Sequence, residues 1–343
     1  MYRIITLTIN PAIDKSTMVD RMVPNSKLRC ASPRYDAGGG GINVSRAIKK
    51  LGGSSLCIYL AGGPSGDFLK SLLDEENIEQ RVIVTEAWTR ENLSVTDSFC
   101  DQQYRFGMPG SKVNDAEWKE VLTVLEETLT EGDYLVASGS LAPGIPDDFY
   151  HRVALIAEKR NAKLILDTSG EPLIEGVKDG VFLLKPNLSE LSALCGVTSI
   201  STLNLERLAK QFLKENAIEV IVVSMGASGV MLITHDQIEH IPAPVVLKKS
   251  TIGAGDSMVA AMVLSLSMGK SLSEMARYGV AAGTAATMKP GTQLCDKQNV
   301  DQLHDWIQTQ VEGMENLTSK GESNDIQGLV SSLGDYGANG HAI

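Results

Sequence analysis

Two kinds of segment alternate between residues 116 and 288. Short apolar runs rich in β-branched residues, which are typical of buried strands, are separated by segments with helical periodicity. In chain order, the predicted helices and strands are residues 118–130, 134–138, 147–160, 163–167, 181–184, 189–195, 203–215, 220–224 and 273–288. Strands that alternate with helices are joined by right-handed crossovers into a parallel sheet with helices on both faces. The sequence therefore predicts an α/β fold in three layers around a mainly parallel central sheet.

Polar residues follow several of the predicted strands. The first apolar run, residues 3–9, leads through Asn10 and Pro11 to Asp14, and later strands end in Gly, Ser or Asn. The carboxyl ends of parallel strands lie at one edge of the sheet, which is where open α/β sheets bind ligands. Asp14 is either a ligand contact of this kind or a turn residue, and the local sequence leaves both readings open.

Two segments do not have the pattern of the main sheet. Residues 12–36 and 88–108 alternate polar and apolar side chains over short stretches, and we expect them to form a small β-sheet flap. The folded domain is expected to span residues 1–309. Residues 310–343 end in a segment rich in Gly, Ser and Asn and are expected to form a poorly ordered C-terminal extension.

Four consecutive glycines, Gly38 to Gly41, come shortly before Asn43 and a helix predicted from Val44 to Leu51. Such a run is costly in conformational entropy, so the fold is expected to need it for the close approach of a ligand or another backbone segment. Asn43 suits either a helix cap or a hydrogen bond to a ligand hydroxyl. A flexible linker is the alternative, but predicted elements lie close on both sides.

The stretch Gly253-Ala254-Gly255-Asp256 comes before an apolar helix predicted from Met258 to Met268. Small residues leave the backbone N–H groups of a helix N-terminus accessible, and such groups bind anions. Asp256 is then either the N-cap of the helix or a general base beside a phosphate. The sequence matches neither the P-loop pattern nor the dinucleotide-binding glycine pattern.

Asn187 and Glu190 stand three residues apart at the start of another predicted helix. This spacing is that of a capping box, in which each side chain bonds the backbone of the other residue. It also places two oxygen-bearing side chains on one face of the first helical turn, where they could lie near a metal ion or its waters. The spacing does not distinguish the two readings.

The charge and the cysteines limit the partners of this chain. A formal net charge of −11 argues against nucleic acid and against an anionic membrane, and no run of about 18 apolar residues is present. An anionic small-molecule substrate would therefore need a local cluster of cations. Five widely spaced cysteines without a C-x-x-C pair favour reduced thiols and a cytoplasmic protein.

Taken together, these motifs resemble those of the ribokinase-like PfkB carbohydrate kinases over roughly residues 1–309. The resemblance rests on residues 38–44, on residues 250–257, and on Lys185-Pro186-Asn187 followed by Glu190. Residues 10–14 and 41–44 are similar to the branch that acts on phosphorylated hexoses. The segments most similar to the minor bacterial 6-phosphofructokinases are residues 27–30, 88–90 and 104–106, together with the four glycines.

The resemblance implies a ribokinase-like fold and a glycolytic reaction, the ATP-dependent transfer of a phosphoryl group to the 1-hydroxyl of fructose 6-phosphate. Asp256 would be the base. The backbone of Gly253, Ala254, Gly255 and Asp256 would form the anion hole. The sugar phosphate would be held by Asp14, Lys27, Arg29, Gly38, Gly39, Asn43, Arg90, Arg105 and Ser140. The nucleotide would be held by Lys185, Asn187, Ser224, Gly226, Lys248, Ser250, Thr251, Val280 and Thr284.

The same resemblance implies two cation sites. Mg²⁺ would lie near Asn187 and Glu190, through water or phosphate. A monovalent cation such as K⁺ would be bound by Ser250, Ile252, Ala286, Lys289, Gly291 and Gln293.

The resemblance further implies a homodimer clasped through the β flaps. Two other readings of the function stay open. One is a tagatose-6-phosphate or fructose-1-phosphate kinase, although these usually carry Lys where this chain has Gly40. The other is a sugar-phosphate-binding regulator without turnover. A nucleoside or vitamin kinase is disfavoured, because those substrates have no phosphate for the Arg and Lys cluster.

Overall fold

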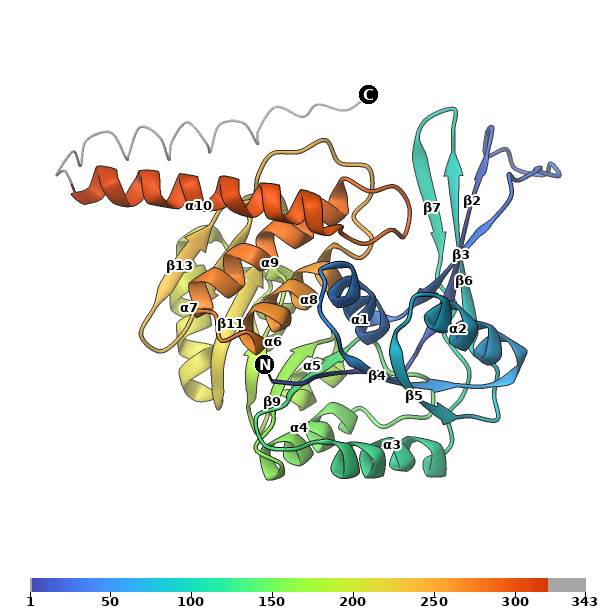
Figure 1. Cartoon of the computed structure of the whole chain (residues 1–343), viewed down its shortest axis with the longest axis horizontal. Coiled ribbons are helices and arrows are strands. Elements are labelled where there is room, and N and C mark those ends of the chain that lie inside the picture. Colours follow the sequence, from blue (N-terminus) through green and yellow to red (C-terminus); the bar gives the residue numbers. More distant parts are fainter. Residues whose placement is uncertain (1, 320–343) are drawn as a thin grey trace.

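A nine-stranded sheet runs through the middle of the protein in the computed structural model, which describes residues 2–319 (Figure 1). From edge to edge its strands are β13 (Ile238–Ile241), β12 (Val230–Ile233), β11 (Ile218–Ser224), β10 (Val181–Leu184), β9 (Lys163–Asp167), β8 (Tyr134–Ser138), β1 (Ile4–Thr8), β4 (Leu56–Ala61) and β5 (Glu79–Val84). The strands from β11 to β5 pair in parallel, and β12 and β13 add an antiparallel edge. A mainly parallel sheet is confirmed.

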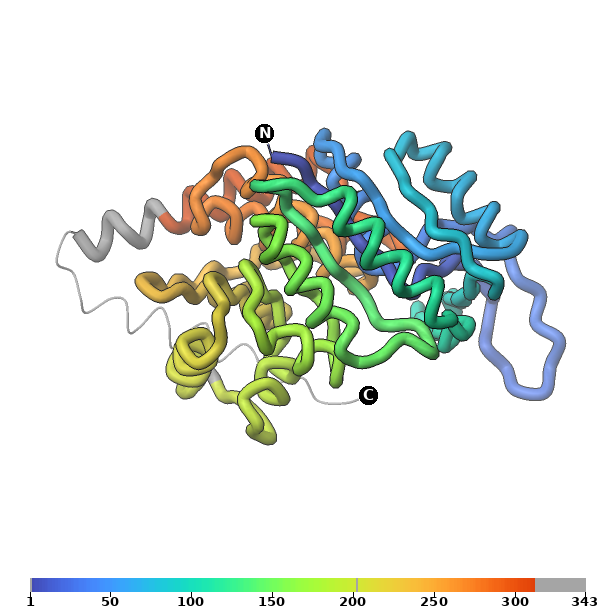
Figure 2. The backbone as a smooth tube through the Cα atoms, turned by 90° about the horizontal axis from the view of Figure 1, so that it is seen from below, coloured from blue at the N-terminus to red at the C-terminus, as the bar shows by residue number. Residues whose placement is uncertain are grey.

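Helices cover both faces of this sheet, as Figures 1 and 2 show. One face carries α1 (Gly40–Lys50), α8 (Ala254–Ser267), α9 (Leu272–Thr287) and α10 (Lys297–Ser319). The other carries α3 (Asp115–Thr128), α4 (Phe149–Lys159), α5 (Glu171–Gly176), α6 (Leu188–Leu194) and α7 (Thr202–Glu215). Side chains of a strand alternate between the two cores, so in β8 Val136 packs towards α1 and α8, whereas Leu135 packs towards the opposite helices. The predicted three-layer α/β class is confirmed.

A separate four-stranded sheet projects from the body at the right of Figure 1. Its strand order is β3 (Arg34–Gly38), β2 (Ala12–Val19), β6 (Arg90–Asp97) and β7 (Gln102–Phe106). Helix α2 (Gly63–Glu75) packs between this sheet and β4. Strands β2, β6 and β7 fall within the two segments predicted to form the flap, and β3 begins in the first segment and runs past its end at residue 36 to Gly38. We call this sheet the flap.

Two predicted boundaries differ from the structure. Helix α1 begins at Gly40 instead of Val44, because Gly39 has a φ of 115° and is the N-cap from which the helix starts. Helix α10 extends to Ser319, so the boundary expected after residue 309 falls inside a helix whose Val311 packs on the core. The remainder of the predicted extension, residues 320–343, lies outside the described residues. Among residues 2–319, no helix has the length and apolar character needed to span a membrane.

Candidate active site

Two cavities meet at the N-terminus of α8. The first, of about 240 Å³, lies between the flap and α8, and we call it the flap cavity. Its lining includes Asp14, Asn43, Arg105, Gly253 and Asp256. The second, of about 390 Å³, lies beside α8 and α9 and includes Ala254 and Gly255 in its lining; we call it the helix cavity. The N-terminal turn of α8 therefore separates two chambers, and the Asp256 side chain lies on the flap side.

Asp256 is not the N-cap of α8. The N-cap is Gly253, with a φ of 71°, and no side chain bonds the free backbone there. The carboxylate instead accepts a hydrogen bond of 2.9 Å from Nδ2 of Asn43, in the first turns of α1. Burial raises the pKa of Asp256 to about 7, with a further contribution from the charge of Asp167, while Asn43 and Lys185 oppose the rise. A carboxyl group with a pKa near neutrality is suited to accept a proton from a substrate hydroxyl.

A positive charge also lies beside the α8 N-terminus. Lys185 is 7% exposed, and its Nζ lies 3.0 Å from Oδ1 of Asp167, at the end of β9. Burial disfavours its charge, but the Asp167 carboxylate outweighs burial, so the pKa of Lys185 is raised and the side chain stays an ammonium. A Cβ on Gly255 would stand 3.7 Å from this ammonium. The first turn of α8 thus combines backbone N–H groups with an adjacent buried cation, and both favour an anion.

The glycine run contacts Asp14, one of the residues that line the flap cavity. Gly38 lies against Asp14, and a Cβ at Gly38 would overlap the Asp14 carboxylate. Oδ1 of Asp14 accepts a 2.8 Å hydrogen bond from Nδ2 of Asn92 on β6, and burial raises the pKa of Asp14. The close approach expected of the glycines is therefore present as a contact between β3 and β2.

The predicted sugar-phosphate residues are only partly brought together. Arg105 lines the flap cavity with Asp14 and Asn43, whereas Ser140 is exposed and accepts a hydrogen bond from Asn10. Arg90 is not among the residues that line the flap cavity. Its guanidinium donates to the backbone oxygens of Met108, Asn10 and Pro11 at 2.6, 2.9 and 3.4 Å and so ties the flap to the end of β1. A phosphate contact by Arg90 stays a prediction.

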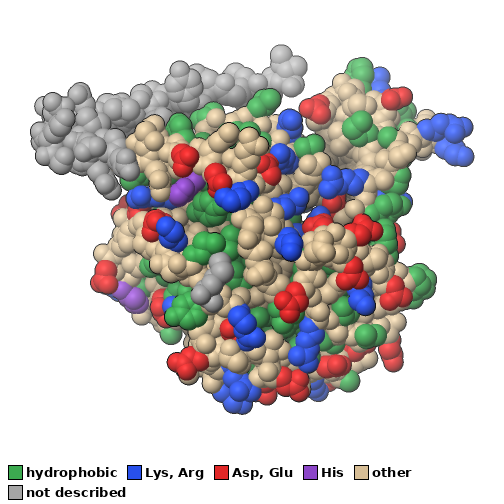
Figure 3. Space-filling model, in the orientation of Figure 1, with side chains coloured by type: hydrophobic (Ala, Val, Ile, Leu, Met, Phe, Trp, Pro, Cys, Tyr) green, Lys and Arg blue, Asp and Glu red, His purple; other side chains and the backbone are tan. Residues whose placement is uncertain are grey.

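Two further predicted phosphate ligands, Lys27 and Arg29, are exposed on the loop between β2 and β3. This loop projects from the body (Figure 2). Lys and Arg side chains lie at its end (Figure 3). Neither residue lines the flap cavity of its own chain.

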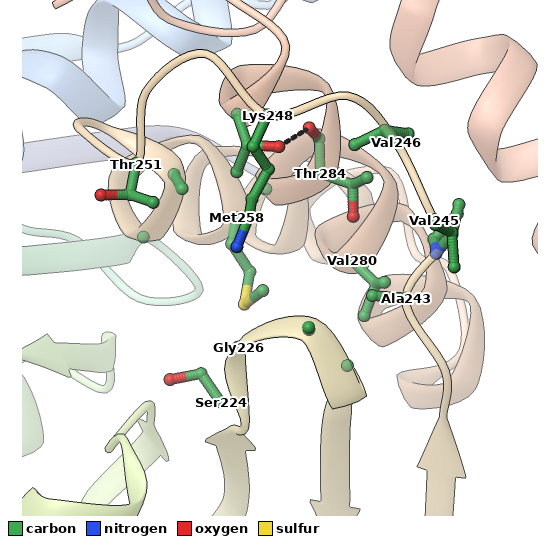
Figure 4. Close-up of a pocket in the computed structure, with 17 residues that line it drawn as sticks. Ser224, Gly226, Ala243, Val245, Val246, Lys248, Thr251, Met258, Val280 and Thr284 are labelled. Carbon is green, nitrogen blue, oxygen red and sulfur yellow. Dashed lines mark hydrogen bonds between the residues drawn. The ribbon is translucent and has the colours of Figure 1, made fainter. Parts of the chain in front are cut away.

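Most of the predicted nucleotide residues meet in the helix cavity (Figure 4). Its lining contains Ser224, Gly226, Lys248, Thr251, Val280 and Thr284. The Lys248 ammonium points into the space between Met258 and the Gly226 turn. The other three predicted residues lie nearby. Lys185 lies next to the α8 N-terminus, and Ser250 donates to the Gly291 oxygen at 2.8 Å. The backbone of Asn187 forms an isolated parallel β-bridge with that of Ser224.

Asn187 and Glu190 form the capping box. Oδ1 of Asn187 accepts from the Glu190 N–H at 2.9 Å, and Oε2 of Glu190 accepts from the Asn187 N–H at 2.8 Å. The second oxygen of Glu190 has no protein donor in these contacts, and burial raises the pKa of this carboxyl. Within residues 2–319, no group of three or more His, Cys, Asp or Glu side chains could hold a metal ion alone. The two hydrogen bonds between Asn187 and Glu190 confirm the capping reading. A metal ion at this position would need ligands from a substrate or water.

The two segments predicted to bind a monovalent cation lie side by side. The N–H groups of Lys249 and Ser250 both donate to the Thr287 oxygen, at 2.8 and 3.2 Å. The Gly291 oxygen accepts from Ser250. The Lys289 side chain forms a 2.6 Å ion pair with Asp296.

Three residues of the site were missed by the sequence reasoning. Asp167 is the last residue of a predicted strand, and Asp14 was selected because it follows one. The same reasoning could therefore have identified Asp167. Asn92 and Thr292 gave no such signal, because only the fold brings them to the flap cavity.

Comparison with known proteins identifies the family of the chain. Residues 7–299 match the model of the pfkB family of carbohydrate kinases, and the chain belongs to that family. Among its relatives is the ATP-dependent 6-phosphofructokinase isozyme 2 of Escherichia coli, 40% identical over 311 residues that cover 90% of this chain and 99% of the relative. The isozyme 2 of Mycobacterium tuberculosis is 42% identical over 301 residues, 88% of each chain. A 1-phosphofructokinase of Borreliella burgdorferi is 33% identical over 88% of this chain and 96% of its own.

Solved structures of phosphofructokinase-2 from E. coli share the fold. The complex with potassium has a TM-score of 0.87 and 39% identity, and the complex with fructose 6-phosphate has a TM-score of 0.84 and 38% identity. A tetrameric inhibited form has a TM-score of 0.85 and 38% identity. Each covers 90% of this chain and 100% of its own.

Proposed function

We propose that this protein is an ATP-dependent 6-phosphofructokinase, which transfers the γ-phosphoryl group of ATP to the 1-hydroxyl of fructose 6-phosphate. The observation that carries the proposal is the position of Asp256 at the junction of two cavities. The flap cavity is polar and would hold the sugar phosphate. The helix cavity, with an apolar wall and Lys248 at its mouth, would hold ATP. The substrate named for the E. coli and M. tuberculosis relatives supports the same assignment.

The chemistry follows from the groups at the α8 N-terminus. Asp256 accepts the proton of the 1-hydroxyl while that oxygen forms a bond to the γ-phosphorus and the bond to the β–γ bridging oxygen breaks, which releases ADP. The N–H groups of Gly255 and Asp256 and the Lys185 ammonium stabilise the charge of the transferred group. Phosphoryl transfer depends mainly on such positioning and neutralisation of charge.

Two cations fit residues of this site. The free oxygen of Glu190 and the Asp167 carboxylate are the hard donors that Mg²⁺ takes, and ATP and water would complete its shell. Mg²⁺, when bound, neutralises phosphate charge. Main-chain oxygens of the adjacent segments 250–252 and 286–293 suit K⁺, and the potassium complex of the E. coli relative supports that assignment.

The choice among hexose phosphates is supported by Gly40. A Cβ at Gly40 would overlap Oγ of Ser138 and the N–H of Gly139, so a long side chain there would require the loop after β8 to move. The lysine usual in fructose-1-phosphate and tagatose-6-phosphate kinases therefore has no room in this arrangement. Arg105, which lines the flap cavity, is the cation best placed for the 6-phosphate.

We propose further that the protein is a cytoplasmic homodimer joined through the flaps. Large apolar side chains are exposed on the flap, among them Met18, Phe99 and Phe106 at 52, 71 and 43%. A second flap packed on this surface would cover them and would bring Lys27 and Arg29 near another chain. The tetrameric form of the E. coli relative is compatible with a dimer as the smaller unit. Light scattering of the wild type and of Phe99→Asp tests the proposal, since a monomeric wild type would refute it.

A coupled assay of ADP release tests the activity itself. We expect the highest kcat/KM for fructose 6-phosphate, a lower value for tagatose 6-phosphate, and the lowest for fructose 1-phosphate. Asp256→Asn, with the same substrates, controls for contaminating kinases. Sugar-phosphate binding without any ADP release would favour the regulator instead.

A further inference from the structure

A buried carboxylate joins three parts of the molecule beside the flap cavity. Asp36 lies on β3 of the flap and is 4% exposed. Its Oδ1 accepts from Arg34 and from Arg46 at 2.8 and 3.1 Å. Its Oδ2 accepts from Nε of Arg34 at 2.9 Å and from Oγ1 of Thr292 at 2.8 Å. Arg34 is on the same strand, Arg46 is on α1, and Thr292 lies between α9 and α10. Among the hydrogen bonds of residues 2–319, the bond between Thr292 and Asp36 is the only one that joins the flap to the segment between α9 and α10.

Arg46 links Asp36 to α1. It is 3% exposed, donates through Nη1 to the Ala37 oxygen at 2.7 Å, and donates through Nε to Glu76 at 2.8 Å. It follows Asn43, the partner of Asp256, by one turn of α1. The Arg46 contacts therefore fix β3 against the helix that positions the base.

Thr292 links Asp36 to the segment between α9 and α10. It is 8% exposed and lines the flap cavity with Gly253 and Asp256. Its neighbour Gly291 accepts from Ser250, which in turn accepts from the Ile252 N–H at 3.2 Å. A short chain of contacts thus leads from Asp36 through the Thr292 segment to the residues just before the α8 N-terminus.

The flap strands carry the groups that would hold the sugar. In the β2–β3 pairing Asp36 is the direct partner of Asp14, and on the other side of β2 Asp14 is the partner of Asn92. A shift of β3 relative to α8 would therefore shift Asp14, Gly38 and Asn92 relative to Asp256. Phosphoryl transfer is sensitive to displacements of this kind, because the attacking oxygen must lie in line with the phosphorus.

We propose that the hydrogen bond from Thr292 to Asp36 is a positioning contact for catalysis, which seats the flap and its bound sugar against the α8 N-terminus. Neither residue is given a role in proton or phosphoryl transfer. The inference rests on the proposed sugar-phosphate kinase activity. It concerns how the flap, which would hold the sugar, is aligned with the α8 N-terminus, which carries the base.

Thr292→Val tests the contact because it removes the hydroxyl donor and keeps the side-chain shape. We expect kcat with fructose 6-phosphate to fall about tenfold or more, KM for ATP to change less than twofold, and the melting temperature to stay close to that of the wild type. Thr292→Ser restores the donor and should recover kcat to within about threefold. Thr292→Val added to Asp36→Ala should lower kcat no further than Asp36→Ala alone, since Asp36→Ala already removes the acceptor of this hydrogen bond.

Arg34→Ala is the matched control. It removes two hydrogen bonds to the same carboxylate from within β3, one to each oxygen, and leaves the Thr292 contact in place, so its kcat should stay within about twofold of wild type. The inference is overturned if Thr292→Val keeps its kcat, if Thr292→Ser is as impaired as Thr292→Val, or if Arg34→Ala loses as much as Thr292→Val. If Thr292→Val does not fold, Thr292→Ala and Thr292→Ser form the comparison. A wild type inactive on fructose 6-phosphate would refute the proposed substrate, and the same comparison would then use the sugar phosphate that it does phosphorylate.

Discussion

Replacing the base with its neutral isostere should make the protein more stable as well as inactive. In Asp256→Asn the side chain keeps an oxygen that can accept from Nδ2 of Asn43, the partner in the present 2.9 Å bond. The burial that raises the pKa of Asp256 opposes its ionisation, and the amide does not ionise. Turnover should fall by roughly two to four orders of magnitude, as expected for loss of a positioned general base.

The size of the stability gain follows from the pKa. The pKa of Asp256 rises from an ordinary value of 3.8 to about 7. A raised carboxyl pKa contributes stability that is complete below the unfolded pKa and is lost as pH rises through the folded pKa. At about 1.4 kcal/mol per pKa unit, the loss in wild type at pH 8 is about 4 kcal/mol, and at pH 5 it is less than about half of that. Asp256→Asn avoids this loss.

Urea unfolding of both proteins without ligands, at about pH 8 and about pH 5, measures the difference. Asp296→Asn is the control of opposite sign. The Lys289 ion pair outweighs burial and lowers the pKa of Asp296 from its ordinary value of 3.8, so this variant should lose stability by the same amount at both pH values, because both lie above 3.8. A mutant Asp256→Asn that is less stable than wild type at pH 8, or equally stabilised at both pH values, would refute the account of Asp256. The kcat/KM of wild type should also rise with pH through about 7.

Three further predictions concern other parts of the site and the chain end. Gly255→Val should fold, since a Cβ there meets only Lys185, yet lose at least tenfold in kcat because its methyls obstruct the N–H groups of the anion hole; circular dichroism and turnover together check this. Arg105→Ala should raise KM for fructose 6-phosphate by roughly thirtyfold and leave the melting temperature unchanged. Arg90→Ala should lower the melting temperature, because three backbone oxygens lose their donor. A lower melting temperature for Arg105→Ala but not for Arg90→Ala would contradict the assignment. A chain ending at Ser319 should keep its kcat and melting temperature, and loss of either would show that residues 320–343 contribute to the body or to an interface.

The fold could be predicted because its signals are local. Each strand of the region around β8, β9 and β11 is a short apolar run, and alternation with helices leaves little choice of topology. The flap was also recognisable, since its strands alternate polar and apolar residues. The start of α1 was placed four residues late, because a glycine run lowers helix propensity although Gly39 is the cap the helix needs.

The site was only partly predictable because some of its contacts depend on tertiary structure. The Gly253–Asp256 stretch indicates an anion site from its local sequence alone, because all the groups involved are neighbours in the chain. Arg90 gave no sign that backbone oxygens would occupy its guanidinium, because those oxygens belong to segments about 80 and 18 residues away in the chain. The bond between Asp36 and Thr292 spans 256 residues, and no local pattern could indicate it.

A direct competition between substrates is the most direct test of the proposed function. Fructose 6-phosphate and fructose 1-phosphate, in equal amounts and with limiting ATP, would be followed together by ³¹P NMR with the wild-type protein. Both yield the same bisphosphate, so the resonance that disappears identifies the substrate that is used. The site described here predicts rapid loss of fructose 6-phosphate while fructose 1-phosphate persists. Preferential loss of fructose 1-phosphate would contradict it.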